Sequence, residues 1–254
     1  MKTYKAYCVD LDGTVYRGTE PISSAVSFVR RLQQKNTEPF FVTNNASMTQ
    51  LQLKQKLARF GVSAQLPRIM SSAIAAAKYI KRWYPGKSVY MIGSEGLEQA
   101  LVQEGIERVG KDADIVLMGI DPSINYEKLA QACLDIRNGA VFLSTNRDLA
   151  FPSERGLLPG NGAFTTLVAA STGVDPVYIG KPEMHMLEAI SHEFGYDKSE
   201  MVMIGDNYET DILAGLNFGV DTVHVNTGVT PMEKVLEKEQ QPTYIVEDLS
   251  FLKV

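Results

Sequence analysis

The sequence predicts an α/β protein built on a parallel sheet, because segments typical of buried strands alternate with segments typical of helices along the chain. Four of the apolar strand segments also end at polar residues suited to phosphate chemistry. The carboxyl ends of parallel strands share one edge of a sheet, and ligands bind in the crevice there. We therefore expect these polar residues to converge on one site.

The first elements follow from apolar periodicity and from helix end signals. After a strand over 6–9, a helix over 23–35 places Ala25, Phe28, Val29 and Leu32 on one face. A strand over 40–42 precedes a helix that opens with a capping box at 47–50 and ends at Gly61. A further strand and helix are expected over 68–82.

A run of turn residues at 83–87 interrupts this series, and a second α/β series begins behind it. We therefore expect one domain interrupted by another, with a core formed by 1–82 and 180–254 and an inserted domain over 83–179. In the inserted domain we expect strands at 89–92, 115–118 and 141–143. We expect three helices there: one that ends at Gly105, one over 125–138 and one between Gly162 and Ser171. The core continues with strands at 177–180, 201–204 and 222–225, the last taken as the final core strand, and a helix start at 230–233.

Composition limits the classes of function. The 254 residues are 44% hydrophobic and 22% charged with a formal net charge of −5, which is typical of a globular protein and unlike the basic surface that a nucleic acid polymer needs. No signal peptide or membrane span is expected, so the predicted location is cytoplasmic. Cys8 and Cys133 are interpreted as core thiols.

Asp10 and Asp12 follow the first strand and lie two residues apart, so an extended backbone directs both carboxylates to the same side. Gly13 permits a tight turn and a close approach of backbone amides to an anion. One carboxylate can attack phosphorus to form an aspartyl-phosphate, and a second can move the protons when that intermediate is hydrolysed.

Two other strand ends offer groups for the phosphate itself. Thr43 follows the second strand and could donate its hydroxyl and backbone amide to phosphate oxygens, and Lys181 follows the strand at 177–180. Asn44, next to Thr43, could order the Asp10 loop or reach the substrate. A fixed ammonium would offset the repulsion between a phosphate dianion and an ionised Asp10. Each segment alone also has an ordinary explanation, a helix cap for Thr43 and a solvated surface charge for Lys181.

Asp206 and Asp211 complete an acidic group after the strand at 201–204. Several carboxylates in one crevice cannot all stay ionised without a cation, and Mg²⁺ prefers such hard oxygen ligands. We expect Asp10 and Asp206 to bind Mg²⁺ through their side chains and Asp12 to bind it through its carbonyl oxygen. A solvated acidic loop is the alternative for this segment alone.

Together these motifs resemble the haloacid-dehalogenase superfamily of phosphohydrolases, in its NagD and p-nitrophenyl-phosphatase-like branch. The resemblance covers nearly the whole chain and implies a Rossmann-like parallel-sheet core with an inserted α/β cap domain. It rests on the four motifs Asp10–Val15, Thr43–Asn45, Lys181–Pro182 and Gly205–Asp206 with Asp211, and on the cap segments 93–97 and 160–163.

The resemblance implies a role for each motif residue. Asp10 would be the nucleophile and Asp12 the general acid/base, while Thr43 and Lys181 would hold the phosphoryl group. The resemblance further implies that Asp206 binds Mg²⁺ and that Asp211 supports the metal site.

The inserted domain is expected to influence the choice of substrate. Asn146, Arg147 and Asp148 end one of its strands and begin a loop that reaches Gly160, so we expect them to contact the leaving group. An ordinary connecting loop is the alternative. An exposed face of the same domain could support a homodimer.

The expected function is Mg²⁺-dependent hydrolysis of a small phosphorylated metabolite, such as a sugar phosphate or a nucleoside monophosphate, with p-nitrophenyl phosphate as an artificial substrate. A phosphotransferase or mutase would use the same Asp10 chemistry. A non-catalytic phosphate sensor is a third interpretation, which the presence of a nucleophile disfavours.

Overall fold

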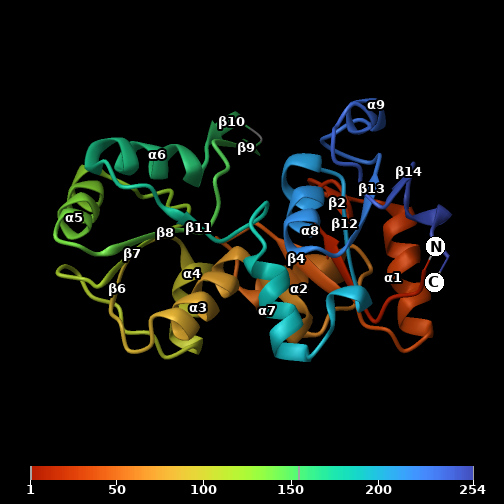
Figure 1. Cartoon of the computed structure of the whole chain (residues 1–254), viewed down its shortest axis with the longest axis horizontal. Helices are drawn as coiled ribbons and strands as arrows, with labels where there is room; N and C mark the ends of the chain where they lie inside the picture. Colours follow the sequence, from red (N-terminus) through yellow and green to blue (C-terminus); the bar gives the residue numbers. More distant parts are fainter. Residues whose placement is uncertain (1, 154, 254) are drawn as a thin grey trace. The chain divides into compact units, whose positions relative to one another are not determined.

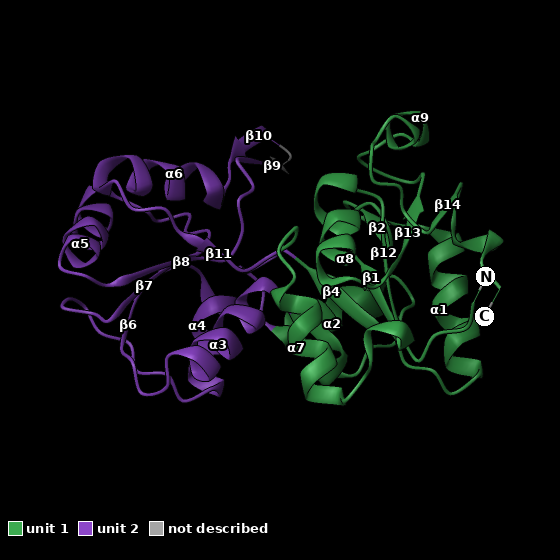
Figure 2. Cartoon of the chain, in the orientation of Figure 1, with its two compact units in different colours: residues 1–43, 50–70, 181–254 green, residues 44–49, 71–180 purple. Residues whose placement is uncertain are grey.

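The computed structural model describes residues 2–153 and 155–253, which belong to two compact units (Figures 1 and 2). Unit 1 comprises residues 1–43, 50–70 and 181–254, and unit 2 comprises residues 44–49 and 71–180. This division differs from the expected boundary at residue 82, because helix α3 (Ser72–Trp83) contacts α4 (Glu95–Gln103) and groups with unit 2.

A six-stranded sheet forms the centre of unit 1, in the order β14-β13-β12-β1-β4-β5. Every residue of β1, β4 and β12 is buried, as expected of parallel strands covered on both faces. The pairings of β1 with β4 and β12, and of β13 with β12 and β14, are parallel. The strands are β1 (Ala6–Asp10), β4 (Phe40–Thr43), β5 (Ile69–Ser71), β12 (Met201–Gly205), β13 (Asp221–Val225) and β14 (Tyr244–Val246).

The prediction that the strand at 222–225 is the last in the core is wrong, because β14 follows it and extends the sheet by one edge strand. Its three residues are only partly buried, so it lacks the apolar run that marks the inner strands. Two short strands after β1, β2 (Tyr16–Arg17) and β3 (Glu20–Pro21), form a separate antiparallel pair.

The helices of unit 1 bury one face each. In α1 (Ser23–Gln34) the predicted face is confirmed, because Ala25, Phe28, Val29 and Leu32 are all buried. Gly195 and Gly219 end two later helices in the left-handed conformation that favours glycine. The other helices are α2 (Gln50–Arg59), α7 (His185–Phe194), α8 (Leu213–Phe218) and α9 (Met232–Leu236).

Two predicted helix starts differ from the structure. Helix α2 begins at Gln50 rather than at a cap on Ser47, because the side chain of Asn45 accepts the N–H groups of Ser47 and Met48 in a separate turn. At α9 the N-cap position falls on Pro231, and the predicted cap Thr230 instead accepts a hydrogen bond from the N–H group of Tyr208.

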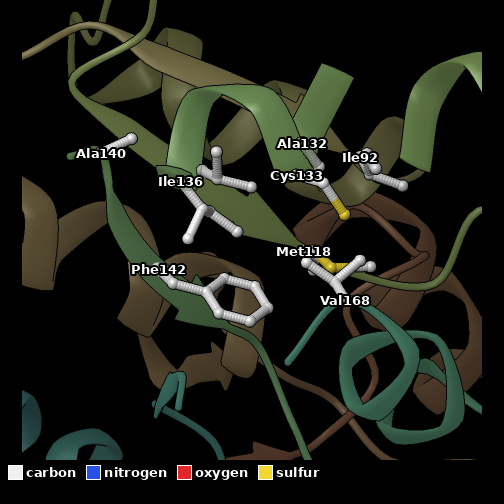
Figure 3. Close-up of a cluster of buried hydrophobic side chains, with 9 residues drawn as sticks. Ile92, Met118, Ala132, Cys133, Ile136, Ala140, Phe142 and Val168 are labelled. Carbon is white, nitrogen blue, oxygen red and sulfur yellow. The ribbon is translucent and has the colours of Figure 1, made fainter. Parts of the chain in front are cut away.

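Unit 2 contains a four-stranded sheet in the order β11-β8-β7-β6, in which all neighbours are parallel. Helices α5 and α6 contact each other, and residues from both pack with residues of the sheet in the buried cluster of Figure 3. Cys133 lies in this cluster, and both it and Cys8 are buried free thiols, as predicted. The elements are β6 (Val89–Ile92), β7 (Ile115–Met118), α5 (Tyr126–Arg137), β8 (Val141–Ser144), the antiparallel pair β9 (Ala150–Ser153) and β10 (Gly156–Pro159), α6 (Asn161–Thr172) and β11 (Val177–Tyr178).

The core of unit 1 supports a prediction about stability. Phe28 is fully buried and its ring meets that of Tyr7 edge to face, with 5.9 Å between the centroids. Phe28→Ala should lower the free energy of unfolding by about 3–5 kcal/mol, since the lost contacts and the cavity both destabilise the fold. Phe251→Ala is the matched control, because Phe251 is 67% exposed and should change stability by about 0.5 kcal/mol or less. Equal effects in urea unfolding would contradict this assignment of the core.

Candidate active site

The site begins where β1 ends, at Asp10, which is buried with 7% of its surface exposed. After it the backbone turns tightly, so that the carbonyl oxygen of Leu11 accepts the N–H groups of Val15 at 2.8 Å and Tyr16 at 3.1 Å. Gly13 occupies this turn with φ +92°, a backbone conformation that favours glycine. The turn thus follows from the Asp-Gly-Thr sequence, as the close spacing of the motif indicated.

Lys181 lies against Asp10 although 171 residues separate them in the chain. Its Nζ is 2.5 Å from Oδ1 of Asp10 and 2.6 Å from Oδ1 of Asp211, and it donates to the carbonyl oxygen of Val42 at 3.2 Å. The lysine is only 2% exposed, so it is not the solvated surface charge that an isolated lysine usually is.

Asp211 reaches Lys181 from η3 (Tyr208–Ile212), a π-helical turn that follows β12. The N–H group of Asn207 donates to the other oxygen of Asp211 at 3.1 Å, so both carboxylate oxygens have partners. Single π-helical turns occur frequently at functional sites.

Asp206 follows β12 and is fully buried. Its Oδ1 accepts the hydroxyl of Thr14 at 3.0 Å, and its Oδ2 accepts the backbone N–H of Val229 at 2.6 Å. Gly13 and Gly228 lie so close to this carboxylate that a Cβ atom at either position would overlap with it. The carboxylate is therefore held by two hydrogen bonds between two glycine backbones.

Asp10, Asp206 and Asp211 form an acidic cluster, in which one carboxylate oxygen of each lies within 4.8 Å of the others. Burial, followed by the charge of Asp211, raises the pKa of Asp10 well above its usual range. The same two causes raise the pKa of Asp206 to about 6. Burial alone would lower the pKa of Lys181, but Asp10 and Asp211 more than offset it and hold that pKa above its usual range.

The charges of the acidic cluster suit a divalent cation. Three buried carboxylates face one ammonium, so ionising all three leaves an excess of two negative charges in a buried site. Hard oxygen ligands that converge over a few ångströms are also the donors that Mg²⁺ requires. The donor set therefore fits the Mg²⁺ ion that the sequence predicts.

The carboxylate of Asp12 does not belong to the acidic cluster among the described residues, and its predicted part in metal binding is through its carbonyl oxygen. Its side chain is 60% exposed, and Oδ2 accepts the hydroxyl of Tyr16 at 3.1 Å. Lys56 Nζ lies 4.0 Å from Oδ1. Burial and the neighbouring charge of Asp12 raise the pKa of Tyr16, so its phenol keeps the proton that it donates.

The predicted phosphate ligands Thr43 and Asn44 fall in different units. Thr43 ends β4 in unit 1 and is buried, whereas Asn44 groups with unit 2. There the carbonyl oxygen of Asn44 accepts the hydroxyl of Ser72 at 2.7 Å and the side-chain amide of Asn146 at 3.0 Å.

The other predicted residues of the inserted domain also have partners within unit 2. The guanidinium of Arg147 lies 4.7 Å from the centroid of the Tyr178 ring, and the N–H of Asp148 donates to Oδ1 of Asn146 at 3.3 Å. The buried side chain of Asn161 donates to the carbonyl oxygen of Asn146 at 3.0 Å. Asn146 is thus fixed at its side chain and its backbone.

Some residues of the site were not predicted from the sequence. Thr14, Gly228 and Val229 all contact Asp206, and the hydroxyl of Thr227 donates to the carbonyl oxygen of Gly13 at 2.7 Å. Residues 226–228 follow an apolar strand as the predicted motifs do, but they carry no charge that would indicate a phosphate or metal site.

Comparison with known proteins decides the family. A model described as "Haloacid dehalogenase-like hydrolase" matches residues 7–107, and a second HAD-hydrolase-like model matches residues 178–252. The 5'-nucleotidase YutF of Bacillus subtilis is 49% identical over 250 residues, which cover 98% of each chain. The chain belongs to the haloacid dehalogenase-like hydrolases.

Other relatives agree along the full length of this hydrolase. The acid sugar phosphatase of Staphylococcus aureus is 47% identical over 98% of this chain and 97% of its own. A crystal structure of a double mutant of the thermostable NPPase from Geobacillus stearothermophilus matches with a TM-score of 0.93 and 44% identity, covering 100% of this chain and 99% of the other. The p-nitrophenyl phosphatase from Archaeoglobus fulgidus matches with a TM-score of 0.92 and 30% identity, covering 98% of both chains.

These relatives show that this hydrolase acts on phosphoric monoesters. The parallel-sheet α/β fold predicted from the sequence is confirmed by the same structural neighbours. In the part of the chain that the structure describes, no helix is long and apolar enough to cross a membrane.

Proposed function

We propose that this hydrolase cleaves small phosphomonoesters in two steps, with Asp10 as the nucleophile and Mg²⁺ as the cofactor. The observation that carries the proposal is the pairing of Asp10 with Lys181 at 2.5 Å beside Asp206 and Asp211. A fixed positive charge beside the carboxylate reduces the repulsion that a phosphate dianion meets on approach.

In the first step an oxygen of Asp10 forms a bond to phosphorus while the bond to the leaving oxygen breaks. Asp12 gives its proton to that leaving oxygen. In the second step Asp12 takes a proton from water as the water oxygen bonds to phosphorus and the bond to Asp10 breaks. The exposed position of the Asp12 side chain supports this role, because a proton donor must reach both the leaving group and water.

Mg²⁺ would be held by the side chains of Asp10 and Asp206 and the carbonyl oxygen of Asp12, with Asp211 supporting the site. When bound, it would neutralise the excess charge of the carboxylates and polarise the phosphoryl oxygens. Lys181 would bind the phosphoryl group and, together with Mg²⁺, favour the ionised form of Asp10. Thr43 would donate its hydroxyl to a phosphoryl oxygen, and Asn44 would order the Asp10 loop or reach the substrate.

The names of the relatives support small metabolites as substrates. One is a 5'-nucleotidase and another an acid sugar phosphatase, so we propose nucleoside monophosphates and sugar phosphates as the substrate classes. We further propose that Asn146, Arg147 and Asp148 contact the leaving group. Fixing Asn146 through both Asn44 and Asn161 would give this segment a defined shape.

The nucleophile is tested by Asp10→Asn, which should lower kcat/KM for p-nitrophenyl phosphate about a thousand-fold or more, because the covalent route is lost. Asp175→Asn is the matched control, since Asp175 is exposed in unit 2 and should leave the rate unchanged. Near-normal turnover by Asp10→Asn would refute the assignment.

Release of free phosphate in the presence of an added sugar acceptor separates hydrolysis from phosphoryl transfer.

Metal binding is tested without activity, by thermal unfolding of chelator-treated protein with and without MgCl₂. At pH 7.5 and 10–100 times the dissociation constant, Mg²⁺ should stabilise the fold by about 1.5–3 kcal/mol. The pKa of Asp206 is raised to about 6, so protons compete with the cation below that pH, and the stabilisation should be smaller at pH 5.

Asp206→Asn should remove the Mg²⁺-dependent stabilisation at both pH values. The matched control is Asp135→Asn, because Asp135 is equally buried but lies in unit 2. An undiminished shift in Asp206→Asn would rule out this residue as a ligand.

The substrate role of the inserted segment is tested by Arg147→Ala and Asp148→Ala. Either change should alter the ratio of activities toward a nucleoside monophosphate and a sugar phosphate by about tenfold, because lost leaving-group contacts affect the two substrates unequally. Lys111→Ala, at an exposed position of unit 2, is the control. An unchanged ratio in both variants would show that this loop only connects its neighbours.

A further inference from the structure

Asp12 is held by two groups that have no part in the chemistry proposed above. Its Oδ2 accepts the hydroxyl of Tyr16 at 3.1 Å, and its Oδ1 lies 4.0 Å from the ammonium of Lys56. Tyr16 begins β2, after the turn that follows β1, and Lys56 comes from α2. The two oxygens of one exposed carboxyl group are thus approached from two different elements of unit 1.

The hydroxyl of Tyr16 has a fixed position. The residue is 1% exposed, and its ring lies 4.8 Å from that of Phe60 and 4.0 Å from the ammonium of Lys56, measured to the centroids. Its backbone is also fixed, because its N–H donates to Leu11 and its carbonyl oxygen accepts the N–H of Gly13. The phenol can therefore impose its orientation on a more mobile partner.

Asp12 is such a partner. Its side chain is 60% exposed, so packing restricts its rotamer only weakly and the contacts with Tyr16 and Lys56 orient it. A general acid contributes only when its proton lies within hydrogen-bond reach of the reacting oxygen, and small displacements cost large factors in rate. Occupation of Oδ2 by the Tyr16 hydroxyl leaves Oδ1 as the oxygen that exchanges a proton.

We propose that Tyr16 and Lys56 are positioning residues that orient the carboxyl group of Asp12 for proton transfer, an inference that rests on the general acid/base role proposed for Asp12. Tyr16 keeps its own proton throughout. The Oδ1–H bond of Asp12 breaks as the leaving oxygen gains that proton, and the same oxygen regains a proton from water in the second step. Lys56 limits the movement of both Asp12 and the Tyr16 ring.

The hydroxyl of Tyr16 and its ring have different roles. The ring packs against Phe60 and would serve the fold in any case, whereas the hydroxyl contacts Asp12. Tyr16→Phe removes the hydroxyl and retains the ring, so it isolates the positioning role. Tyr196→Phe is the matched control, because the hydroxyl of Tyr196 accepts a hydrogen bond from the guanidinium of Arg68, at 3.4 Å.

The test compares leaving groups. An alkyl phosphate such as β-glycerophosphate needs a proton on its departing oxygen, whereas p-nitrophenolate leaves readily without one. Tyr16→Phe should lower kcat/KM for β-glycerophosphate about tenfold and that for p-nitrophenyl phosphate about twofold or less. Lys56→Met should shift the same ratio in the same direction, and Lys56→Arg should restore it. Equal losses on both substrates in Tyr16→Phe would overturn the proposal.

A double-mutant cycle shows whether Tyr16 acts through Asp12. In an Asp12→Ala background Tyr16→Phe should have no further effect on the leaving-group ratio, because the group it orients is gone. If Asp12→Ala shifts the ratio and Tyr16→Phe does not, the positioning role is wrong while the proposed function stands. If Asp12→Ala lowers both rates equally, the general acid role is itself wrong and the inference fails with it.

Discussion

The site depends on one electrostatic arrangement, the ammonium of Lys181 enclosed by the carboxylates of Asp10 and Asp211. A buried charge is tolerated only when its partners compensate the loss of water, and here two ion pairs and the carbonyl oxygen of Val42 do so. Compensation is complete for the lysine but not for the acids, because Asp206 adds a third carboxylate. The net negative charge of the site therefore favours the binding of a cation over that of a neutral ligand.

The fold brings these groups together by joining distant parts of the chain at adjacent strands. Asp10 ends β1, and Asp206 follows β12, which pairs with β1 in parallel register. The π-helical turn after β12 then carries Asp211 back to Lys181. Parallel pairing at the centre of the sheet is thus what places Asp206 and Asp211 beside Asp10.

Much of this arrangement could be predicted, because inner parallel strands are continuous apolar runs whose ends can be recognised in the sequence. Asp10, Asp206 and Asp211 follow such runs, and the structure brings them together. The strand predicted at 177–180 is not in the core sheet, because β11 pairs with β8 in unit 2, although Lys181 itself groups with unit 1 and contacts Asp10. The edge strand β14 and the hairpin pairs β2–β3 and β9–β10 were missed because they are short and at least partly exposed, which leaves no strong periodicity.

Other features of the site depend on tertiary contacts that no local pattern shows. The turn of Asp12 toward Tyr16 arises from hydrogen bonds to Leu11, and spacing alone suggested that Asp10 and Asp12 point the same way. The grouping of α3 and Asn44 with unit 2 likewise follows from packing on α4 and from the hydrogen bonds to Ser72 and Asn146.

The enclosure of Asp206 between Gly13 and Gly228 has a consequence for how this protein can evolve. A Cβ atom at position 13 or 228 would overlap with this carboxylate, so a larger residue at either position would displace it. Change at either glycine alone is therefore disfavoured. The two glycines thereby constrain the residue at position 206 as strongly as the chemistry of its carboxylate does.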